Sequence, residues 1–371
     1  MSEQRISLSL SGLLTVVGSV LLLVVLWQLR SLLVILMVSV VLAASIAPMV
    51  DWAERYRVPR WLGAISAYLL IFLALTGVGL VIGPTVFEQI EQLIRQLPAY
   101  AETLRSLIEQ WVLRISDTRP ELIRQLLDTQ SLTNWVIRSS QQVVLRSYGI
   151  TRGILGGVFS LVLSVFIAGY MLADSQTLVR GFVRLFPKPW DDRLAAQVGP
   201  ISQRMGGYIR GRLLVSVVLG IATTAGLSFL GLPQYALGLG AIAGVTNLIP
   251  FLGPILGAIP ALVVALAQGG WLVVWVLILF VIIQNVETYI LDPLLVGSSV
   301  GVHPLYQLLS VLGGVQLLGI LGAVIVPPWF AGASVLVEQL YLRPKLIAER
   351  RAASLPRPPQ PAPPLPEHLP N

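Results

Sequence analysis

The stretch that decides the fold is residues 213–286, which opens with LLVSVVLGIATTAGLSFLGLPQYALGLG, passes through NLIPFLGPILGAIP at 247–260 and closes with LFVIIQNV. Its 74 consecutive positions contain no Asp, Glu, Lys or Arg. One bilayer crossing needs about 20 apolar residues, and a charge at its centre costs roughly 2.5–3.5 kcal/mol. Because backbone groups in lipid must be satisfied within their own segment, the stretch predicts three membrane-spanning helices.

Shorter uncharged runs lie on both sides of this stretch. They are residues 6–29, 31–50, 61–87 and 153–173 before it, and 293–337 after it. Only 12% of all residues are charged, against roughly a quarter in a soluble domain, and mean hydropathy is +0.80. We therefore predict an all-α polytopic membrane protein with about eight transmembrane helices, a Gly/Pro-broken and possibly re-entrant segment, and an amphipathic helical insertion.

The charged segments divide the chain into regions. We expect three transmembrane helices in 1–87, an extracytoplasmic insertion at 88–152, a helix at 153–173, a cytoplasmic linker at 174–212, a transmembrane core with broken helices at 213–340, and a proline-rich cytoplasmic tail at 341–371. Apolar residues of the insertion recur at helical spacing, as in Ile90, Leu93, Ile94 and Leu97. Such a stripe indicates a buried face without naming its partner, so the insertion lies on the membrane, packs between subunits or caps the bundle.

Positive charges predict the orientation. With the N-terminus inside, the inner segments hold 16 Lys and Arg residues, whereas the short outer loops hold only Arg30. Eight more lie in the long segment 88–152, and segments of more than about 60 residues count little in this rule. Both termini are therefore expected to be cytoplasmic, in a multi-pass protein of the plasma (inner) membrane. The basic residues flank the spans and do not cluster with aromatic residues, which argues against nucleic-acid binding.

Several classes of chemistry are excluded by composition. The chain has no cysteine and two histidines, His303 and His368, so thiol catalysis, Fe–S clusters and His-rich metal sites are not expected. There is no G-x-x-x-x-G-K-[ST] motif for nucleotide phosphates. GSSVG at 297–301 matches G-x-S-x-G, but a nucleophile elbow at Ser299 needs a strand–turn–helix context. We expect no enzyme activity, no cofactor and no metal.

The segment NLIPFLGPILGAIP is the best pointer to a transport site. A straight helix cannot run through Pro250, Pro254 and Pro260, because proline lacks the backbone donor and clashes with the preceding turn. Broken backbone at membrane depth is tolerated where it is buried in protein or lines a cavity. The alternative is an external loop between two helices. The candidate transport-pathway residues are Asn247, Pro250, Gly253, Pro254, Pro260 and Gln316.

A weaker sequence repeat involves the residues that precede this segment. Pro233, Tyr235 and Leu237 recur as Pro304, Tyr306 and Leu308, and a second apolar stretch with Gly and Pro follows at 313–328. Paired broken segments are typical of internal repeats in transporters.

Glu287 and Asp292 are the only acidic residues between Arg212 and Glu338. Ionisable residues near intramembrane segments are candidates for ion or proton coupling. Alternatively, both residues mark the place where a helix leaves the bilayer. Polar residues such as Asn247, Thr246 and Gln316 line a pathway or, equally, hydrogen-bond between helices.

The amino-acid sequences of these motifs, and their order along the chain, resemble those of the autoinducer-2 exporter (AI-2E) family of PerM-type permeases. The residues that carry the resemblance are YIRG at 208–211, IPFLGPILGAIP, and GVHP at 301–304 followed by GILG and Pro327. Two positions depart from the family's pattern: many relatives have Gln at the position of Arg212, and Asn at that of Thr288 or Tyr289. The resemblance implies a small-molecule exporter, with signalling molecules exported by some members and cation/proton exchange attributed to others.

We therefore expect a gradient-driven secondary transporter that exports small polar or amphipathic organic solutes. A cation/proton antiporter and a membrane scaffold without transport remain alternatives, although a scaffold has no need of Gly/Pro breaks at depth. The expected partners are membrane lipids, a small-molecule or ion substrate, and further copies of the chain in a homo-oligomer.

Overall fold

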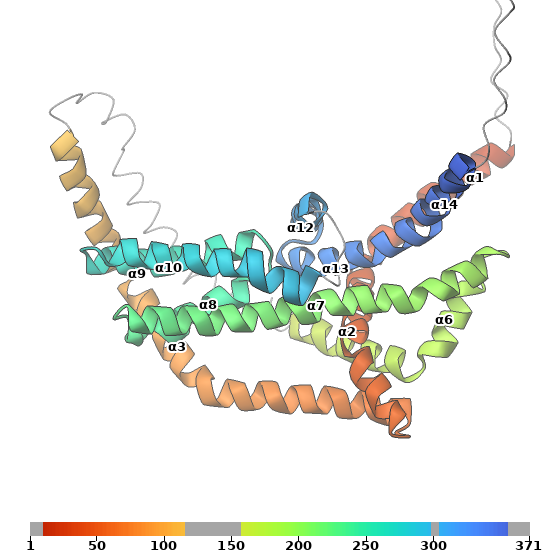
Figure 1. Ribbon diagram of the computed structural model, residues 1–371, viewed down its shortest axis with the longest axis horizontal. Helices are drawn as coiled ribbons and strands as arrows, with labels where there is room; N and C mark the ends of the chain where they lie inside the picture. The colour runs from red at the N-terminus through yellow and green to blue at the C-terminus, as the bar shows by residue number, and fades with distance from the viewer. Residues whose placement is uncertain (1–9, 116–156, 298–303, 355–371) are drawn as a thin grey trace, which may run out of the picture.

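The computed structural model describes residues 10–115, 157–297 and 304–354, and every regular element in those ranges is a helix (Figure 1). This confirms the predicted all-α polytopic class. The bounds are α1 Leu10–Gln28, α2 Arg30–Arg55, α3 Arg60–Ile115, a helix at Gly157–Ala173, α6 Ser175–Val183, α7 Trp190–Phe229, α8 Pro233–Thr246, α9 Leu252–Gln268, α10 Leu272–Val286, the π-helix η1 Glu287–Gly297, α12 Pro304–Leu318, α13 Ile320–Leu336, the π-helix η2 Val337–Leu342 and α14 Arg343–Ser354.

Five helical stretches among the described residues are long and apolar enough to cross a membrane, and a sixth forms if a bent pair counts as one span. The five are Arg30–Arg55, Arg60–Tyr100, Trp190–Phe229, Leu272–Gly297 and Ile320–Arg351. The bent pair is Gly157–Ala173 with α6, which meet at 86°. Shorter apolar helices make up the remaining predicted spans, so the expected number of eight stays a prediction.

Helix α3 runs without interruption from the third predicted span into the predicted insertion. Its 56 residues extend over about 84 Å at the usual rise of 1.5 Å per residue. No helix end falls at residue 88, where the sequence changes from apolar to charged. Leu93 and Tyr100 of its second half are buried against α8 and α9. In the described part of the insertion, Leu93 of the apolar stripe thus packs on the bundle, whereas Ile94 is exposed.

Helix α7 likewise crosses a predicted boundary. The chain is non-helical at 184–189, around Pro187 and Pro189, and α7 then continues from Trp190 past Arg212 to Phe229. The predicted linker 174–212 therefore ends inside a helix. A continuous α7 joins the basic segment rigidly to the transmembrane core.

A proline and an arginine explain how α2 packs against α7. Pro48 lies inside α2 and cannot donate to the carbonyl of Ala44, four residues earlier. Arg210 of α7 replaces that donor, because its Nη1 lies 3.3 Å from the Ala44 oxygen and 2.8 Å from the Ser45 oxygen. Gly206 permits the close approach, since a Cβ there would lie 2.6 Å from the Ala44 carbonyl carbon.

Helices α8 and α9 form a hairpin between α7 and α10. With 14 and 17 residues, they extend over about 21 and 26 Å, short of the roughly 30 Å of a hydrocarbon core. The chain enters α8 and leaves α9 at the same end of the bundle (Figure 1). The hairpin tip, residues 247–251, includes buried Asn247 and Pro250 and a positive φ of 64° at Phe251.

The prolines of this segment act differently from one another. Pro250 lies in the tip, whereas Pro254 lies in the first turn of α9, where a missing N–H leaves no hydrogen bond unmade. Pro260 lies in the interior of α9, which continues past it to Gln268. The expectation that Pro260 interrupts the helix is therefore wrong, because the loss of one donor does not outweigh the packing of α9.

A second hairpin follows, made by α12 and α13 around Gly319, whose φ is 65°. Pro304 begins α12 just as Pro233 begins α8, which agrees with the repeat seen in the sequence. Gly314 and Gly322 face each other across this hairpin, and a Cβ on Gly314 would lie 2.7 Å from the Gly322 carbonyl carbon. Within the predicted broken stretch 313–328, the break is at Gly319, whereas Pro327 lies inside α13.

Candidate functional site

A buried cluster of charged and polar side chains forms where the hairpin tip meets α7 and η1. Arg212 Nη1 lies 2.9 Å from Glu287 Oε1 and 3.3 Å from Asp292 Oδ1. Arg212 Nη2 lies 3.3 Å from Asn247 Oδ1 at the tip of α8–α9. The side chains of Arg212 and Glu287 are each 4% exposed, and that of Asp292 is 38% exposed. We call these four residues the charged cluster.

Glycines let the three elements come close enough to form the charged cluster. A Cβ on Gly211 would lie 2.9 Å from the Leu295 carbonyl carbon of η1. A Cβ on Gly253, at the start of α9, would lie 2.6 Å from Asn247 Cα and 2.7 Å from the Thr246 carbonyl carbon. Any larger residue at either glycine would push the backbones apart, so these positions determine where Arg212 and Asn247 lie.

The charged cluster contains more acid than base and has unused hydrogen-bonding atoms. One guanidinium faces two carboxyl groups, so the fully ionised cluster carries a net charge of one minus. Arg212 Nε, Asn247 Nδ2 and Glu287 Oε2 are buried and have no hydrogen-bond partner among the residues that the structure describes. Unpaired buried polar groups are costly, and buried ion pairs are retained in spite of a desolvation penalty. Such a group of atoms can bind a proton, a cation or a polar solute.

The backbone that carries the two acids is unusual. Glu287 begins the π-helix η1, which continues directly from α10 to Gly297. π-helical turns are rare and are frequently found at functional sites. Since Glu287 lies inside this continuous helix and is buried, it does not mark a helix end in an exposed loop. Asp292, in the middle of η1, is the member of the charged cluster nearest to the protein surface.

Three of the predicted site residues, Asn247, Glu287 and Asp292, come together in the charged cluster. Pro250 is buried in the hairpin tip, Gly253 is buried at the start of α9, and Pro254 and Pro260 are partly buried on α9. Thr246 instead donates its hydroxyl to backbone carbonyls of its own helix. Gln316 is exposed on α12, and within the described ranges no hydrogen bond joins it to the charged cluster.

Arg212 is the member of the site that the sequence reasoning missed. Its charge alone assigns Arg212 to the basic linker 174–212, and its residue type departs from the family pattern. A signal was present, because Arg212 and Glu287 are the two residues that bound the uncharged stretch 213–286. Neighbouring Tyr208, also buried, accepts a long hydrogen bond from Gln307 of α12 at 3.5 Å and brings the second hairpin to the same part of α7.

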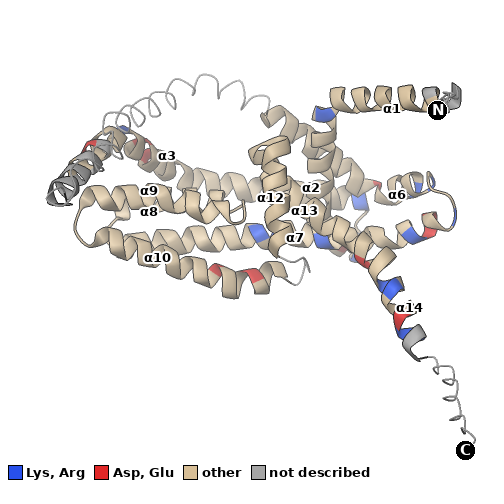
Figure 2. Cartoon of the chain, turned by 90° about the horizontal axis from the view of Figure 1, so that it is seen from above, with Lys and Arg blue, Asp and Glu red and all other residues tan. Residues whose placement is uncertain are grey.

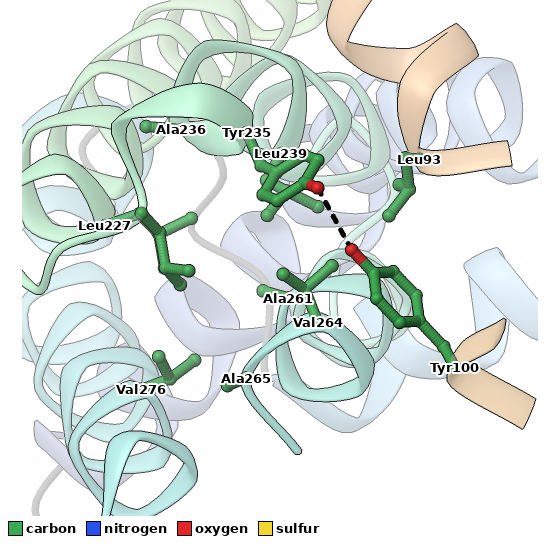
Figure 3. Close-up of a cluster of buried hydrophobic side chains, with 11 residues drawn as sticks. Leu93, Tyr100, Leu227, Tyr235, Ala236, Leu239, Ala261, Val264, Ala265 and Val276 are labelled. Atoms are coloured by element: carbon green, nitrogen blue, oxygen red, sulfur yellow. Dashed lines mark hydrogen bonds between the residues drawn. The ribbon is translucent and has the colours of Figure 1, made fainter. Parts of the chain in front are cut away.

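A polar clamp holds the open end of the hairpin to α3. The hydroxyl groups of Tyr100 and Tyr235 lie 3.1 Å apart (Figure 3). Both lie within hydrogen-bonding distance of the acceptor Gln96 Oε1, at 2.5 and 2.6 Å. Gln89 Oε1 also accepts from the backbone N–H of Gly238, at 2.7 Å. Apolar residues surround the clamp, among them Leu93 and Leu227 (Figure 3).

A cavity of about 380 Å³ lies beside α7 at the opposite end of the bundle. Its walls are mostly apolar side chains of α2, α6, α7 and the helix Gly157–Ala173, and its polar residues include Asp51, Arg60 and Gln176. Arg60 is held there by Asp51 at 3.0 Å and by the Leu172 carbonyl at 3.4 Å. A cavity of this size and lining is typical of small-molecule sites.

Charged side chains are distributed unevenly over the helices (Figure 2). They gather around the α2–α3 turn, in the first half of α7, on α14 and on the far half of α3, whereas α8, α9, α12 and α13 carry none (Figure 2). The charged cluster is therefore the place where charged side chains from α7 and η1 reach the tip of the α8–α9 hairpin.

The family whose sequence model matches the chain is described as "AI-2E family transporter", and the match covers residues 17–342. YrrI of Bacillus subtilis (strain 168), named as a candidate transport protein, is 32% identical over 305 residues, or 79% of this chain and 82% of YrrI. YueF of the same organism, also named as a candidate transport protein, is 29% identical over 290 residues, or 76% of this chain and 77% of YueF. PerM of Escherichia coli (strain K12), named as a candidate permease, is 29% identical over 264 residues, or 68% of this chain and 71% of PerM.

Proposed function

This chain belongs to the AI-2E transporter family, and we propose that it is a gradient-driven exporter of small organic solutes or signalling molecules. The observation that carries the proposal is the buried charged cluster at the tip of a hairpin too short to cross the bilayer. Broken helices that bring polar groups to membrane depth are typical of substrate and ion sites in secondary transporters. The sequence has no phosphate-binding loop, so the proposed energy source is an ion gradient or the solute's own gradient, and the alternative is a partner protein.

The charged cluster supports coupling to one monovalent cation. With Arg212, Glu287 and Asp292 ionised, the cluster has one negative charge in excess, which a proton or a sodium ion would neutralise. Glu287 is the principal candidate because it is buried and its Oε2 is unpaired. Asp292 is partly exposed and would exchange ions with solvent more readily. The same feature favours the second candidate function, cation/proton antiport.

The pathway is proposed to pass the hairpin tip, with Asn247, Pro250 and Gly253 nearest to it and Pro254, Pro260 and Gln316 farther along. The cavity beside α2 and α6 has apolar walls and polar residues, a combination that suits the entry of an amphipathic solute. No catalytic step is proposed, and Ser299 lies outside the described residues.

The proposed topology places both termini on the cytoplasmic side of the plasma membrane. In support, the far half of α3 and the open end of the hairpin lie together, held by the polar clamp, while the basic start of α7 lies at the other end (Figures 1 and 2). The domain limits derived from charge remain those given above, with 88–152 extracytoplasmic.

We also propose a homo-oligomer. In the membrane segment of α3, only 6% of the most apolar window is buried, and large side chains such as Phe72, Leu80 and Val81 are exposed. Lipids and neighbouring copies would share this surface. Intact-complex mass measurements in detergent and in native membrane particles would show the number of copies.

Everted membrane vesicles test the function. Labelled autoinducer-2 serves as the probe solute, and a pH-sensitive dye reports proton movement after addition of sodium or potassium. An exporter accumulates the solute when a gradient is imposed. An antiporter moves protons in response to the cation without any solute, and a scaffold does neither.

Single substitutions assign the coupling. Glu287→Gln should remove the gradient dependence while the protein stays folded and inserted, and Asp292→Asn should have the smaller effect. Full transport with an intact gradient response in Glu287→Gln would exclude Glu287 from coupling.

A further inference from the structure

Two hydroxyl groups inside α7 have no hydrogen-bond partner within 10–115, 157–297 and 304–354, the described parts of the chain. Ser216 is 4% exposed and Thr223 is 1% exposed, and the hydroxyl oxygen of each is buried and unpaired. Elsewhere on α7 the usual local bond is made: Thr224 donates to the Gly220 carbonyl at 2.9 Å, and Ser228 donates to the Thr224 carbonyl at 2.8 Å. A buried hydroxyl without a partner is unfavourable, so Ser216 and Thr223 are exceptions that need a reason.

The two hydroxyls continue a line that starts at Arg212. At 100° and 1.5 Å per residue, Ser216 and Thr223 lie within about 40° of Arg212 around α7, and about 6 and 16 Å farther along it. Arg212, whose Nε is also buried and unpaired, begins the line in the charged cluster. We call Arg212, Ser216 and Thr223 the polar stripe of α7.

The residues beside the polar stripe show what faces it. On one side Gly220 approaches α8, where a Cβ on Gly220 would lie 3.1 Å from the Gly240 oxygen. On the other side Gly226 approaches Leu279 of α10, and Val215 and Leu219 belong to an apolar cluster that includes Ile283 of α10. The polar stripe therefore lies along the seam between the hairpin α8–α9 and α10.

The seam ends at an apolar cluster. Leu227, one turn beyond Thr223, is fully buried among Leu232, Tyr235 and Val276 (Figure 3). Tyr100 and Tyr235 of the polar clamp belong to the same buried cluster. A line of unused polar atoms thus runs from the charged cluster toward the open end of the hairpin and stops at a hydrophobic barrier.

We propose that Ser216 and Thr223 line the transport path between the charged cluster and the open end of the hairpin, where their hydroxyls take up the hydrogen bonds of water and cargo when the hairpin separates from α10. The structure then corresponds to the closed path. This inference rests on the proposed transport function. It identifies the residues of α7 that form one wall of the path. A hydroxyl both donates and accepts, so it can serve successive polar groups as they pass.

Cysteine reactivity tests the path without a known substrate, because the chain has no native thiol. Ser216→Cys and Thr223→Cys are treated in membranes with silver ions and with a cationic methanethiosulfonate. Val215→Cys, on the same helix in the apolar cluster and fully buried, is the matched control. We expect both stripe cysteines to react at least about ten-fold faster than the control. A ten-fold factor corresponds to a difference of about 1.4 kcal/mol in the free energy of the opening that exposes the thiol. Equal, slow rates at all three positions would overturn the proposal.

Variants without the hydroxyls provide a second test, because thermal stability and flux should respond differently if the hydroxyls line the path. Ser216→Ala and Thr223→Val delete an unpaired buried group, so thermal stability should stay unchanged or rise. Flux of the probe solute or cation should nevertheless fall about five- to ten-fold, the factor for one neutral hydrogen bond. Thr224→Val, which removes a hydroxyl already bonded within α7, is the control and should retain flux. Lower stability with normal flux in the stripe variants would refute the path.

The two proposals fail in different ways. If the wild-type chain moves neither solute nor cation, the transport function fails whatever the thiol rates are. If it transports but the stripe cysteines are as inert as Val215→Cys, only the path along α7 is wrong.

Discussion

Arg212→Gln should destabilise the protein strongly, because Arg212 is the cation that lets two carboxyl groups lie together in a buried site. Glu287 Oε1 and Asp292 Oδ1 bind the same Nη1 atom at 2.9 and 3.3 Å. The two oxygens are therefore at most about 6 Å apart, where two unit charges repel by about 3 kcal/mol at an effective dielectric constant of 20. Breaking a buried pair from one side costs about 3–5 kcal/mol.

Glu287→Gln should cost less than Arg212→Gln. It leaves one guanidinium with one carboxylate, Asp292, and removes a single charge-assisted hydrogen bond worth about 1.5–3 kcal/mol. The double variant Arg212→Gln/Glu287→Gln leaves only one acid and no repulsion. Its cost should therefore fall below the sum of the two single costs by at least about 1 kcal/mol, as expected for residues in one network.

Thermal unfolding in detergent, followed by the loss of the monodisperse peak in size-exclusion chromatography, measures these differences. With about 2 °C per kcal/mol for a chain of this size, Arg212→Gln should lower the melting temperature by about 6–10 °C. Arg204→Gln on the same helix is the matched control. Arg204 pairs with Glu338 at 3.1 Å, with side chains 24% and 43% exposed, and such pairs contribute at most about 1 kcal/mol.

Two results would contradict this reasoning. An Arg212→Gln shift no larger than that of Arg204→Gln would show that the buried pair is not a structural link. Strictly additive single and double variants would show that Arg212 and Glu287 do not act on each other.

Three further predictions concern packing and topology. Arg210→Gln should lower stability by about 1–3 kcal/mol by leaving the Ala44 carbonyl unsatisfied; Pro48→Ala in the same chain should recover part of the loss in the melting temperature, since it restores the α2 donor. Gly253→Leu should abolish flux but leave membrane insertion unchanged in a carbonate-wash assay, because bulk at this close approach displaces the hairpin tip; normal flux would show that the tip tolerates displacement. A cysteine replacing Ser354 should be protected from an impermeant thiol reagent in intact cells, and labelling from outside would reverse the predicted topology.

Much of the fold follows from local properties of the sequence. Long uncharged runs are stable only in lipid, where each backbone group must bond within its own helix, so membrane class and helical structure need no knowledge of long-range contacts. Pro250 and the glycines around it likewise marked the break at the hairpin tip. Helix ends were less predictable: α3 passes residue 88 and α13 passes Pro327, because a helix continues wherever packing outweighs a change in polarity or one lost donor.

The site was only half visible in the sequence. Asn247, Glu287 and Asp292 were recognised separately, as polar residues that are costly in lipid. That Arg212 joins them, 75 positions before Glu287, depends on α7 and α10 running side by side with the hairpin between them. The same holds for Ser216 and Thr223: their residue types are ordinary, and only the seam that buries them shows that their hydroxyls are unused. Composition determines which segments enter the membrane, since that free energy is a sum over residues. Which polar atoms meet there was decided by tertiary packing, because it depends on distances between helices that no local sequence property encodes.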